Sequence, residues 1–160
     1  MNGKIAIAAV WMTLMTAGAH AADQACIELK TSAETEQEVI EQGRKVKRLV
    51  PAGKVVPGNE VVWTITAVNV CKTPTDNVVV ANPVPEQMIY VANSAMGTGT
   101  DIAYSLDGKE FQNAAELQVR AAGGSTRVAR ADEYRAIRWT YQTAFAPGAT
   151  AFVRYRAVVK

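Results

Sequence analysis

The stretch that most constrains the fold of this chain is residues 54–85, where two runs rich in β-branched residues are separated by turn signals. Pro57 and Gly58 open the first run, and residues 73–76 (Thr-Pro-Thr-Asp) interrupt the chain before the second run, residues 77–81. Pro83 and Pro85 then end it, because proline cannot donate a hydrogen bond to a strand ladder. In the first run, alternate side chains fall on one apolar face: Val61, Trp63, Ile65 and Ala67. A period of two predicts strands with one face in a core.

This alternation makes a specific prediction about stability. Trp63 is expected in the core, so Trp63→Ala should cost about 3–5 kcal/mol. Thr64 is expected on the outer face, where replacement by alanine should be nearly neutral.

The rest of the chain repeats the strand pattern up to its last residue. Ile137, Trp139 and Tyr141 alternate with polar residues, and so do Val153 and Tyr155 in the last run. Turn signals recur every 8–12 residues or so, and there is no long helical pattern. Hydrophobic residues make up 49% and charged residues 20% of the chain, which argues against disorder. We therefore predict an all-β fold, an Ig-like antiparallel β-sandwich.

Several motifs occur together and in order. They are residues 56–65 (Val-Pro-Gly-Asn-Glu-Val-Val-Trp-Thr-Ile), Asn69, residues 77–85 (Asn-Val-Val-Val-Ala-Asn-Pro-Val-Pro), residues 104–108 (Tyr-Ser-Leu-Asp-Gly), residues 137–139 (Ile-Arg-Trp) and residues 146–148 (Ala-Pro-Gly). This set resembles the DUF11 family of bacterial cell-surface and secreted Ig-like repeats over roughly residues 50–160. The chain departs from the family at Val70-Cys71, where a glycine is usual, and at Asn82, where aspartate is common. The resemblance implies an Ig-like fold and export, but no particular activity.

The first 21 residues have the features of a secretory signal peptide. Lys4 precedes an apolar run over residues 5–15, and Ala19-His20-Ala21 matches a small-x-small cleavage site. The run is too short for a membrane anchor, which must cross about 30 Å of hydrocarbon. We predict a signal peptide (1–21), an N-terminal strand with a charged hairpin (22–53) and a DUF11-like sandwich domain (54–160). The expected location is the periplasm, the cell surface or the extracellular space, with no integral membrane segment after cleavage.

Cys26 and Cys71 are the two cysteines of the chain. An even number in an exported protein indicates one structural disulfide. A redox-active pair is the alternative, but the spacing does not fit Cys-x-x-Cys. The bridge leads us to expect that residues 25–30 add a strand to a sheet of the same molecule; the alternative is a sheet of a neighbour, if subunits exchange these segments. The amides of Ile27 and Leu29 should then be as protected from exchange as those of Trp63 and Ile65.

Residues 31–50 allow two interpretations, an amphipathic helix and a hairpin. Acidic residues come first and basic residues follow, which suits the dipole of a helix. Gln42-Gly43 lies between the two blocks, and the same charges would pair across a hairpin. Few residues here are apolar, so we favour an exposed hairpin.

The sequence offers little for catalysis. His20 is the only histidine and lies in the predicted signal peptide, so the exported chain has no Ser-His-Asp triad and no histidine metal ligand. Without Lys4, 16 basic residues face 15 acidic ones, a balance that does not predict binding to nucleic acid. We predict no enzymatic activity, no cofactor and no metal.

Arginines cluster late in the chain. If Arg138 and Arg154 lay on neighbouring strands, they could form a stripe with Arg156 that binds an anionic polysaccharide or lipid headgroup. A charged surface that keeps the sheet soluble is the simpler interpretation. The function we favour is therefore a non-enzymatic module that acts through protein contacts or self-assembly at the envelope or outside the cell. The alternative is a module that binds glycans or anionic ligands.

Overall fold

The computed structural model describes residues 26–160, which are almost entirely strands and turns. The strands are β1 (Ile27–Glu41), β2 (Arg44–Pro51), β3 (Glu60–Asn69), β4 (Val79–Pro83), β5 (Met88–Tyr90), β6 (Met96–Gly97), β7 (Thr100–Ser105), β8 (Gln118–Arg120), β9 (Thr126–Val128), β10 (Ala136–Tyr141) and β11 (Thr150–Val159). A short 3-10 helix, η1 (Ala131–Glu133), lies before β10. The predicted all-β class is confirmed. The predicted signal peptide lies outside the described residues, and within residues 26–160 no helix is long and apolar enough to span a membrane.

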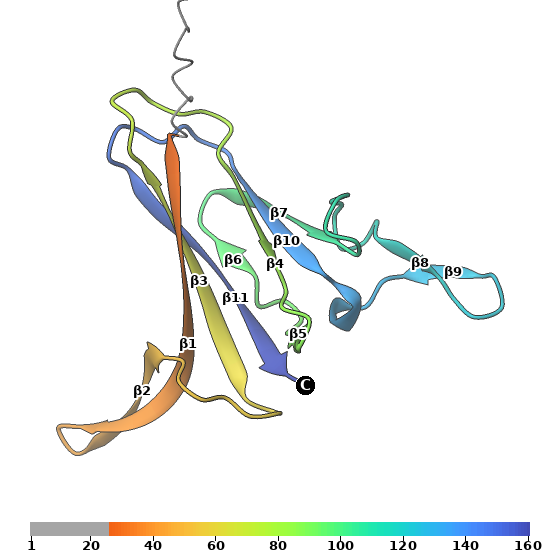
Figure 1. Cartoon of the computed structure of the whole chain (residues 1–160), viewed down its shortest axis with the longest axis horizontal. Helices are drawn as coiled ribbons and strands as arrows, with labels where there is room; N and C mark the ends of the chain where they lie inside the picture. Colours follow the sequence, from red (N-terminus) through yellow and green to blue (C-terminus); the bar gives the residue numbers. More distant parts are fainter. Residues whose placement is uncertain (1–25) are drawn as a thin grey trace, which may run out of the picture.

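Two antiparallel sheets face each other (Figure 1). The larger sheet has the strand order β2-β1-β3-β11-β5, with β6 also paired to β11. The smaller sheet has the order β4-β10-β7. The β8–β9 hairpin extends to one side of both sheets. One hydrophobic cluster draws side chains from both sheets, so the architecture is a β-sandwich.

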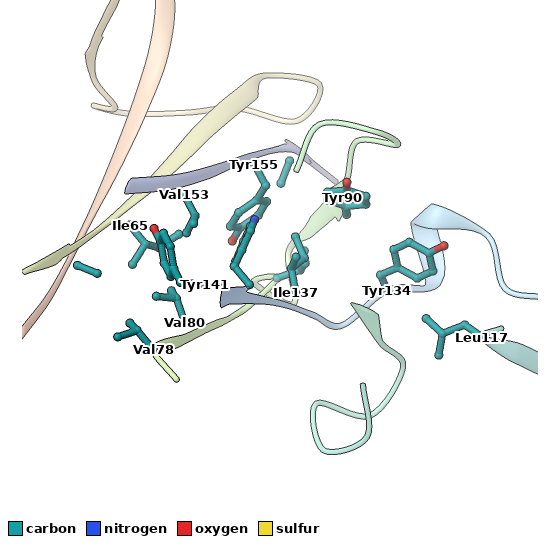
Figure 2. Packing of buried hydrophobic residues seen from close by; sticks show 14 of the residues in the cluster. Ile65, Val78, Val80, Tyr90, Leu117, Tyr134, Ile137, Tyr141, Val153 and Tyr155 are labelled. Atoms are coloured by element: carbon teal, nitrogen blue, oxygen red, sulfur yellow. The ribbon is translucent and has the colours of Figure 1, made fainter. Parts of the chain in front are cut away.

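The core lies between the two sheets. In Figure 2, Val153 and Tyr155 of β11 point towards Val80 and Ile137 of the smaller sheet. Trp139 of β10 is fully buried, and its ring centroid lies 6.2 Å from that of Tyr155. The predicted alternation in β10 and β11 is therefore confirmed, because residues at a spacing of two supply the buried faces of both strands.

The core face of β3 is also the predicted one. Val61, Ile65 and Ala67 are buried, whereas Trp63 is only partly buried and stacks on Tyr155 with ring centroids 6.3 Å apart. Trp63 thus lies towards the margin of the core. We now expect Trp63→Ala to cost the lower part of the range for a large core deletion, about 3 kcal/mol.

The opposite face of β3 is less open than its polar residues suggest. Val62 is 2% exposed and Thr64 is 9% exposed. The Thr64 hydroxyl accepts a 2.9 Å hydrogen bond from Nε of Arg154 and donates one of 3.3 Å to Glu34. A neutral Thr64→Ala substitution is therefore no longer expected.

The N-terminal part is a strand followed by a hairpin. β1 pairs with β3 over Ile27 to Glu34 and with β2 from Glu34 onward. Gln42 and Gly43 form the turn with φ values of 49° and 75°, as a tight hairpin turn requires. The favoured hairpin is confirmed, and the helical alternative is wrong.

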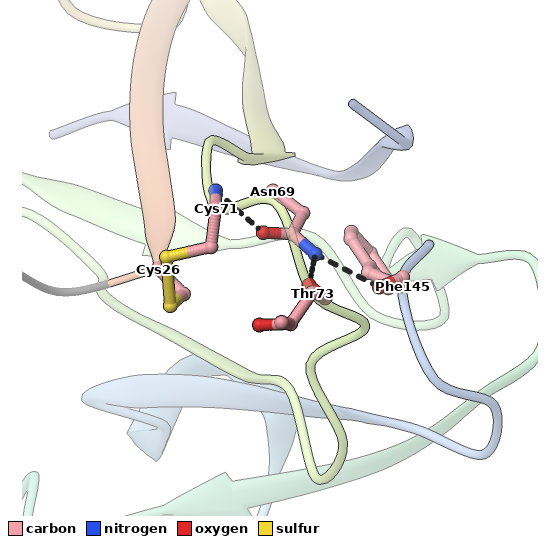
Figure 3. Close-up of a disulfide and its surroundings, with 5 residues drawn as sticks. All are labelled: Cys26, Asn69, Cys71, Thr73 and Phe145. Carbon is pink, nitrogen blue, oxygen red and sulfur yellow. Dashed lines mark hydrogen bonds between the residues drawn. A yellow bond between two sulfur atoms is a disulfide. The ribbon is translucent and has the colours of Figure 1, made fainter. Parts of the chain in front are cut away.

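The disulfide between Cys26 and Cys71 fastens the start of β1 (Figure 3). Its Cα atoms lie 5.0 Å apart, and 45 positions separate the two cysteines. Beside it, the side chain of buried Asn69 donates to the carbonyl oxygens of Thr73 and Phe145, both at 2.9 Å, and accepts a 2.9 Å hydrogen bond from the Cys71 amide. The predicted bridge is confirmed, and Asn69 holds the loop that carries it.

Candidate functional site

The most prominent surface feature is the arm, which we define as residues 35–51. It is a two-stranded ribbon formed by the second half of β1 and all of β2, and it projects away from the sandwich at the lower left of Figure 1. Val39 and Val46 face each other across the ribbon, while Ile40 near the tip is 75% exposed. The arm therefore places one large apolar side chain in solvent, far from the core.

The arm carries acidic residues on β1 and basic residues on β2. Cross-strand ion pairs join Glu38 to Lys45 and Glu36 to Lys47, each at 3.4 Å. Glu41 also pairs with Arg48. Exposed pairs of this kind contribute little to stability, but they fix which side chains the ribbon presents.

An open groove of about 750 Å³ lies where the arm joins the sandwich. Both parts contribute to its lining: Thr35, Glu36 and Lys47 come from the arm, and Glu60, Val62 and Arg156 come from β3 and β11. The lining of this groove is mainly polar.

Arg156 connects the two walls of this groove. Its guanidinium group donates to Glu36 at 2.9 Å and to Glu60 at 2.8 Å. Arg156, and after it Lys47, lower the pKa of the Glu36 carboxyl below its usual value. The arm is therefore anchored to β11 through a carboxylate that stays ionised at neutral pH.

Arg154 lies on the same face of β11. Its Nε atom is bound to Thr64, and its guanidinium carbon lies 5.4 Å from the centroid of the Phe152 ring. Phe152 is 54% exposed. Arg154 therefore lies beside an exposed aromatic ring.

Arg138 does not join the other two arginines. It lies on β10 in the smaller sheet, whereas Arg154 and Arg156 lie on β11 in the larger sheet. Its guanidinium carbon is 4.9 Å from the centroid of the Phe111 ring. The predicted three-arginine stripe required Arg138 and Arg154 to lie on neighbouring strands. This condition is not met, because β10 and β11 follow each other in sequence but belong to different sheets.

Tyrosines form the largest group of titratable side chains near the core. The hydroxyl groups of Tyr90 and Tyr104 lie 3.3 Å apart, and burial, followed by this contact, raises the pKa of Tyr104. Burial also raises the pKa of Tyr155 to about 12. The hydroxyl groups of Tyr104 and Tyr155 therefore stay protonated at neutral pH, where they pack and donate hydrogen bonds.

The described residues 26–160 contain no group of three or more His, Cys, Asp or Glu side chains that could hold a metal ion. The acidic partners of Arg156 were not identified from the sequence. The acidic-then-basic pattern of residues 31–50 indicated pairing inside the hairpin, whereas Glu36 pairs both inside it and across to β11.

A scan of protein-family models finds no match to this chain, and neither a search of curated proteins nor a search of solved structures finds a similar one.

Proposed function

We propose that this chain is an exported, non-enzymatic Ig-like module that acts through protein contacts at the cell envelope or outside the cell, such as contacts between subunits of a surface assembly. The signal-peptide pattern and the resemblance to DUF11 repeats support export. The Cys26–Cys71 disulfide is compatible with an oxidising compartment. The absence of histidine beyond residue 20 supports a role without a histidine-dependent catalytic triad.

The observation that carries the proposal is the projecting arm. A ribbon that leaves the sandwich adds little to the core, yet here it is fixed at its base by Arg156 and along its length by ion pairs. Ile40 then stands exposed among charges. An exposed apolar side chain within a polar rim is the arrangement found at the centre of protein contacts.

The experiment is site-specific photo-crosslinking in the producing cells. A photoreactive residue at position 40 should give an adduct of defined mass that contains a second protein. Val79, 49% exposed on β4, is the matched control position and should give none. Absence of an adduct from position 40 and from its neighbour Lys45 would contradict a protein contact through the arm.

A glycan or anionic ligand is the second candidate, through Arg154 and Arg156 on β11 and without Arg138, which lies in the other sheet. The exposed Phe152 beside Arg154 favours it, because an aromatic ring and a cation together suit a sugar carboxylate. Arg156 is already neutralised by two carboxylates, so we place this candidate second. Binding on a glycan array that is lost at high salt would support it.

A further inference from the structure

The first half of β1 has one side with no strand paired to it. Over Ile27 to Ala33, β1 pairs with β3 on one side, whereas β2 begins its pairing only at Glu34. No other strand within residues 26–160 pairs with the open side. We call this side of residues 27–33 the β1 edge.

The hydrogen-bond pattern shows which backbone groups face the β1 edge. The Val70 amide donates to the Cys26 carbonyl, so the pair 26/70 is hydrogen-bonded, and residues two apart along β1 repeat this arrangement. Glu28 and Lys30 therefore use their backbone groups on β3. Ile27, Leu29 and Thr31 direct theirs away from β3, as the bond from Ala52 to Ala33 on that same side confirms.

Three other outer strands of the two sheets are poorer templates for pairing. β2 carries four basic residues, Arg44, Lys45, Lys47 and Arg48, which would repel a second copy. β4 ends in Pro83, and the backbone of Tyr104 on β7 already bonds to Gln112. The β1 edge has no such protection, because Glu28 and Lys30 are the only charges in residues 26–32 and cancel each other.

We propose that two copies of this chain pair antiparallel along the β1 edge, centred on Leu29. Leu29 then lies opposite the partner's Leu29, and Ile27 lies opposite the partner's Thr31. Each of these residues offers its amide and its carbonyl to the other chain, so the two larger sheets become continuous. The inference goes beyond the proposed function, because it assigns a second copy of this chain to the β1 edge, a surface separate from the arm.

The side chains select this register. Centred on Leu29, Glu28 lies opposite the partner's Lys30 and Lys30 opposite the partner's Glu28, two complementary pairs on the outer face. Centring on Lys30 would instead place two lysines opposite each other, and centring on Glu28 would do so for two glutamates. Centring on Thr31 would place Glu28 opposite the partner's Glu34.

The side chains on the core face of β1 also favour the register centred on Leu29. Leu29 is directly opposite Ala67 of β3, on the core face, yet it is 45% exposed. In the paired form it contacts its counterpart and loses water-accessible apolar surface. Charge on one face and apolar contact on the other thus favour a single register.

The test is charge reversal, with protein recovered after export and its disulfide intact. Glu28→Lys and Lys30→Glu each place like charges opposite in the pair, on side chains that are 52% and 73% exposed and therefore matter little for folding. For the unaltered chain, we expect analytical ultracentrifugation to give twice the mass of a single chain. For each variant alone, the dissociation constant of the dimer should rise by about tenfold or more. An equimolar mixture of the two should regain dimers, because every opposed pair is then complementary.

Hydrogen exchange gives an independent readout of the same edge. Amides of Glu28 and Lys30 should be protected in every variant, whereas those of Ile27 and Leu29 should be protected only in samples that dimerise. This replaces the expectation that Ile27 and Leu29 are protected within one chain. The inference would be overturned if the unaltered chain stayed monomeric at every protein concentration measured. It would also be overturned if either single variant dimerised as well as the unaltered chain. Crosslinking from position 40 would still decide the proposed function, so the two can fail separately.

Discussion

Glu36 and Arg156 are 120 positions apart in the chain, yet a 2.9 Å hydrogen bond joins their side chains. The bond passes from β1 to β11 over β3, which lies between them in the sheet. It therefore fixes the base of the arm to the last strand of the sandwich.

The first prediction is that Glu36→Gln loosens the arm without unfolding the sandwich. Loss of the carboxylate removes the ionic partner of Lys47 and one of the two ionic partners of Arg156. Amides of the arm, such as that of Val39, should exchange faster, whereas that of Ile65 should keep its rate. Glu110→Gln, an exposed glutamate elsewhere, serves as the control; a change in both regions would contradict a local role.

The second prediction concerns pH and Glu133. A hydrogen bond from Arg127, and another from the Arg130 amide, lower the pKa of Glu133 from 4.5 to about 2. A lowered folded pKa means that the stabilisation is complete above about pH 4.5 and is lost as pH falls towards 2. The unfolding midpoint of the native chain should fall over this window by slightly more than that of Glu133→Gln. Parallel curves for the two proteins would show that the pair has no net effect.

The third prediction concerns the buried hydroxyl of Thr64. Thr64→Val keeps the shape of the side chain but leaves Nε of Arg154 without its acceptor. We expect a loss of about 1–2 kcal/mol in the free energy of unfolding, measured by denaturant titration. Thr66→Val on the same face of β3, at a more exposed position, should change it by less. An equal effect at both positions would assign the loss to strand propensity.

Some of the features behind these predictions can be predicted from the sequence, and others cannot. Trp139 and its neighbours on β10 were placed correctly, because alternation over a few residues reports the burial of a strand face directly. The turn at Gln42-Gly43 was also found, since its residues suit positive φ values. Both signals are local.

The remaining features depend on which strands become neighbours. Arg138 and Arg154 lie on consecutive strands, but β10 and β11 enter different sheets, and no local pattern records that crossover. Thr64 has the residue type of an exposed position, yet side chains from β1 and β11 cover it. The open β1 edge also cannot be predicted from the sequence, because its extent depends on the residue at which β2 begins to pair with β1.

The fourth prediction concerns Asn69, whose side chain bonds to two carbonyls and one amide. Asn69→Ala would leave these groups, of which the Phe145 carbonyl is buried, without the Asn69 side chain as partner, at about 1–3 kcal/mol of unfolding free energy. Asn113→Ala, at an exposed position, should have little effect. Similar losses from both, measured by thermal unfolding, would show that the bonds of Asn69 are replaced by water.

The last prediction is that the disulfide holds the first strand to its sheet. Cys26 lies just before β1, and the bond closes a loop of 45 positions. In the chain-entropy description, opening such a loop costs about 4 kcal/mol. The double variant Cys26→Ser with Cys71→Ser should therefore unfold at a lower denaturant concentration. Because the lost bond is at one end of β1, the Glu28 amide should exchange faster by a larger factor than the Ser32 amide. Alkylation of the native chain without reductant should add no label, whereas two labels would show that the cysteines are free. Uniform acceleration along β1 would indicate a global loss of stability rather than fraying from the bridged end.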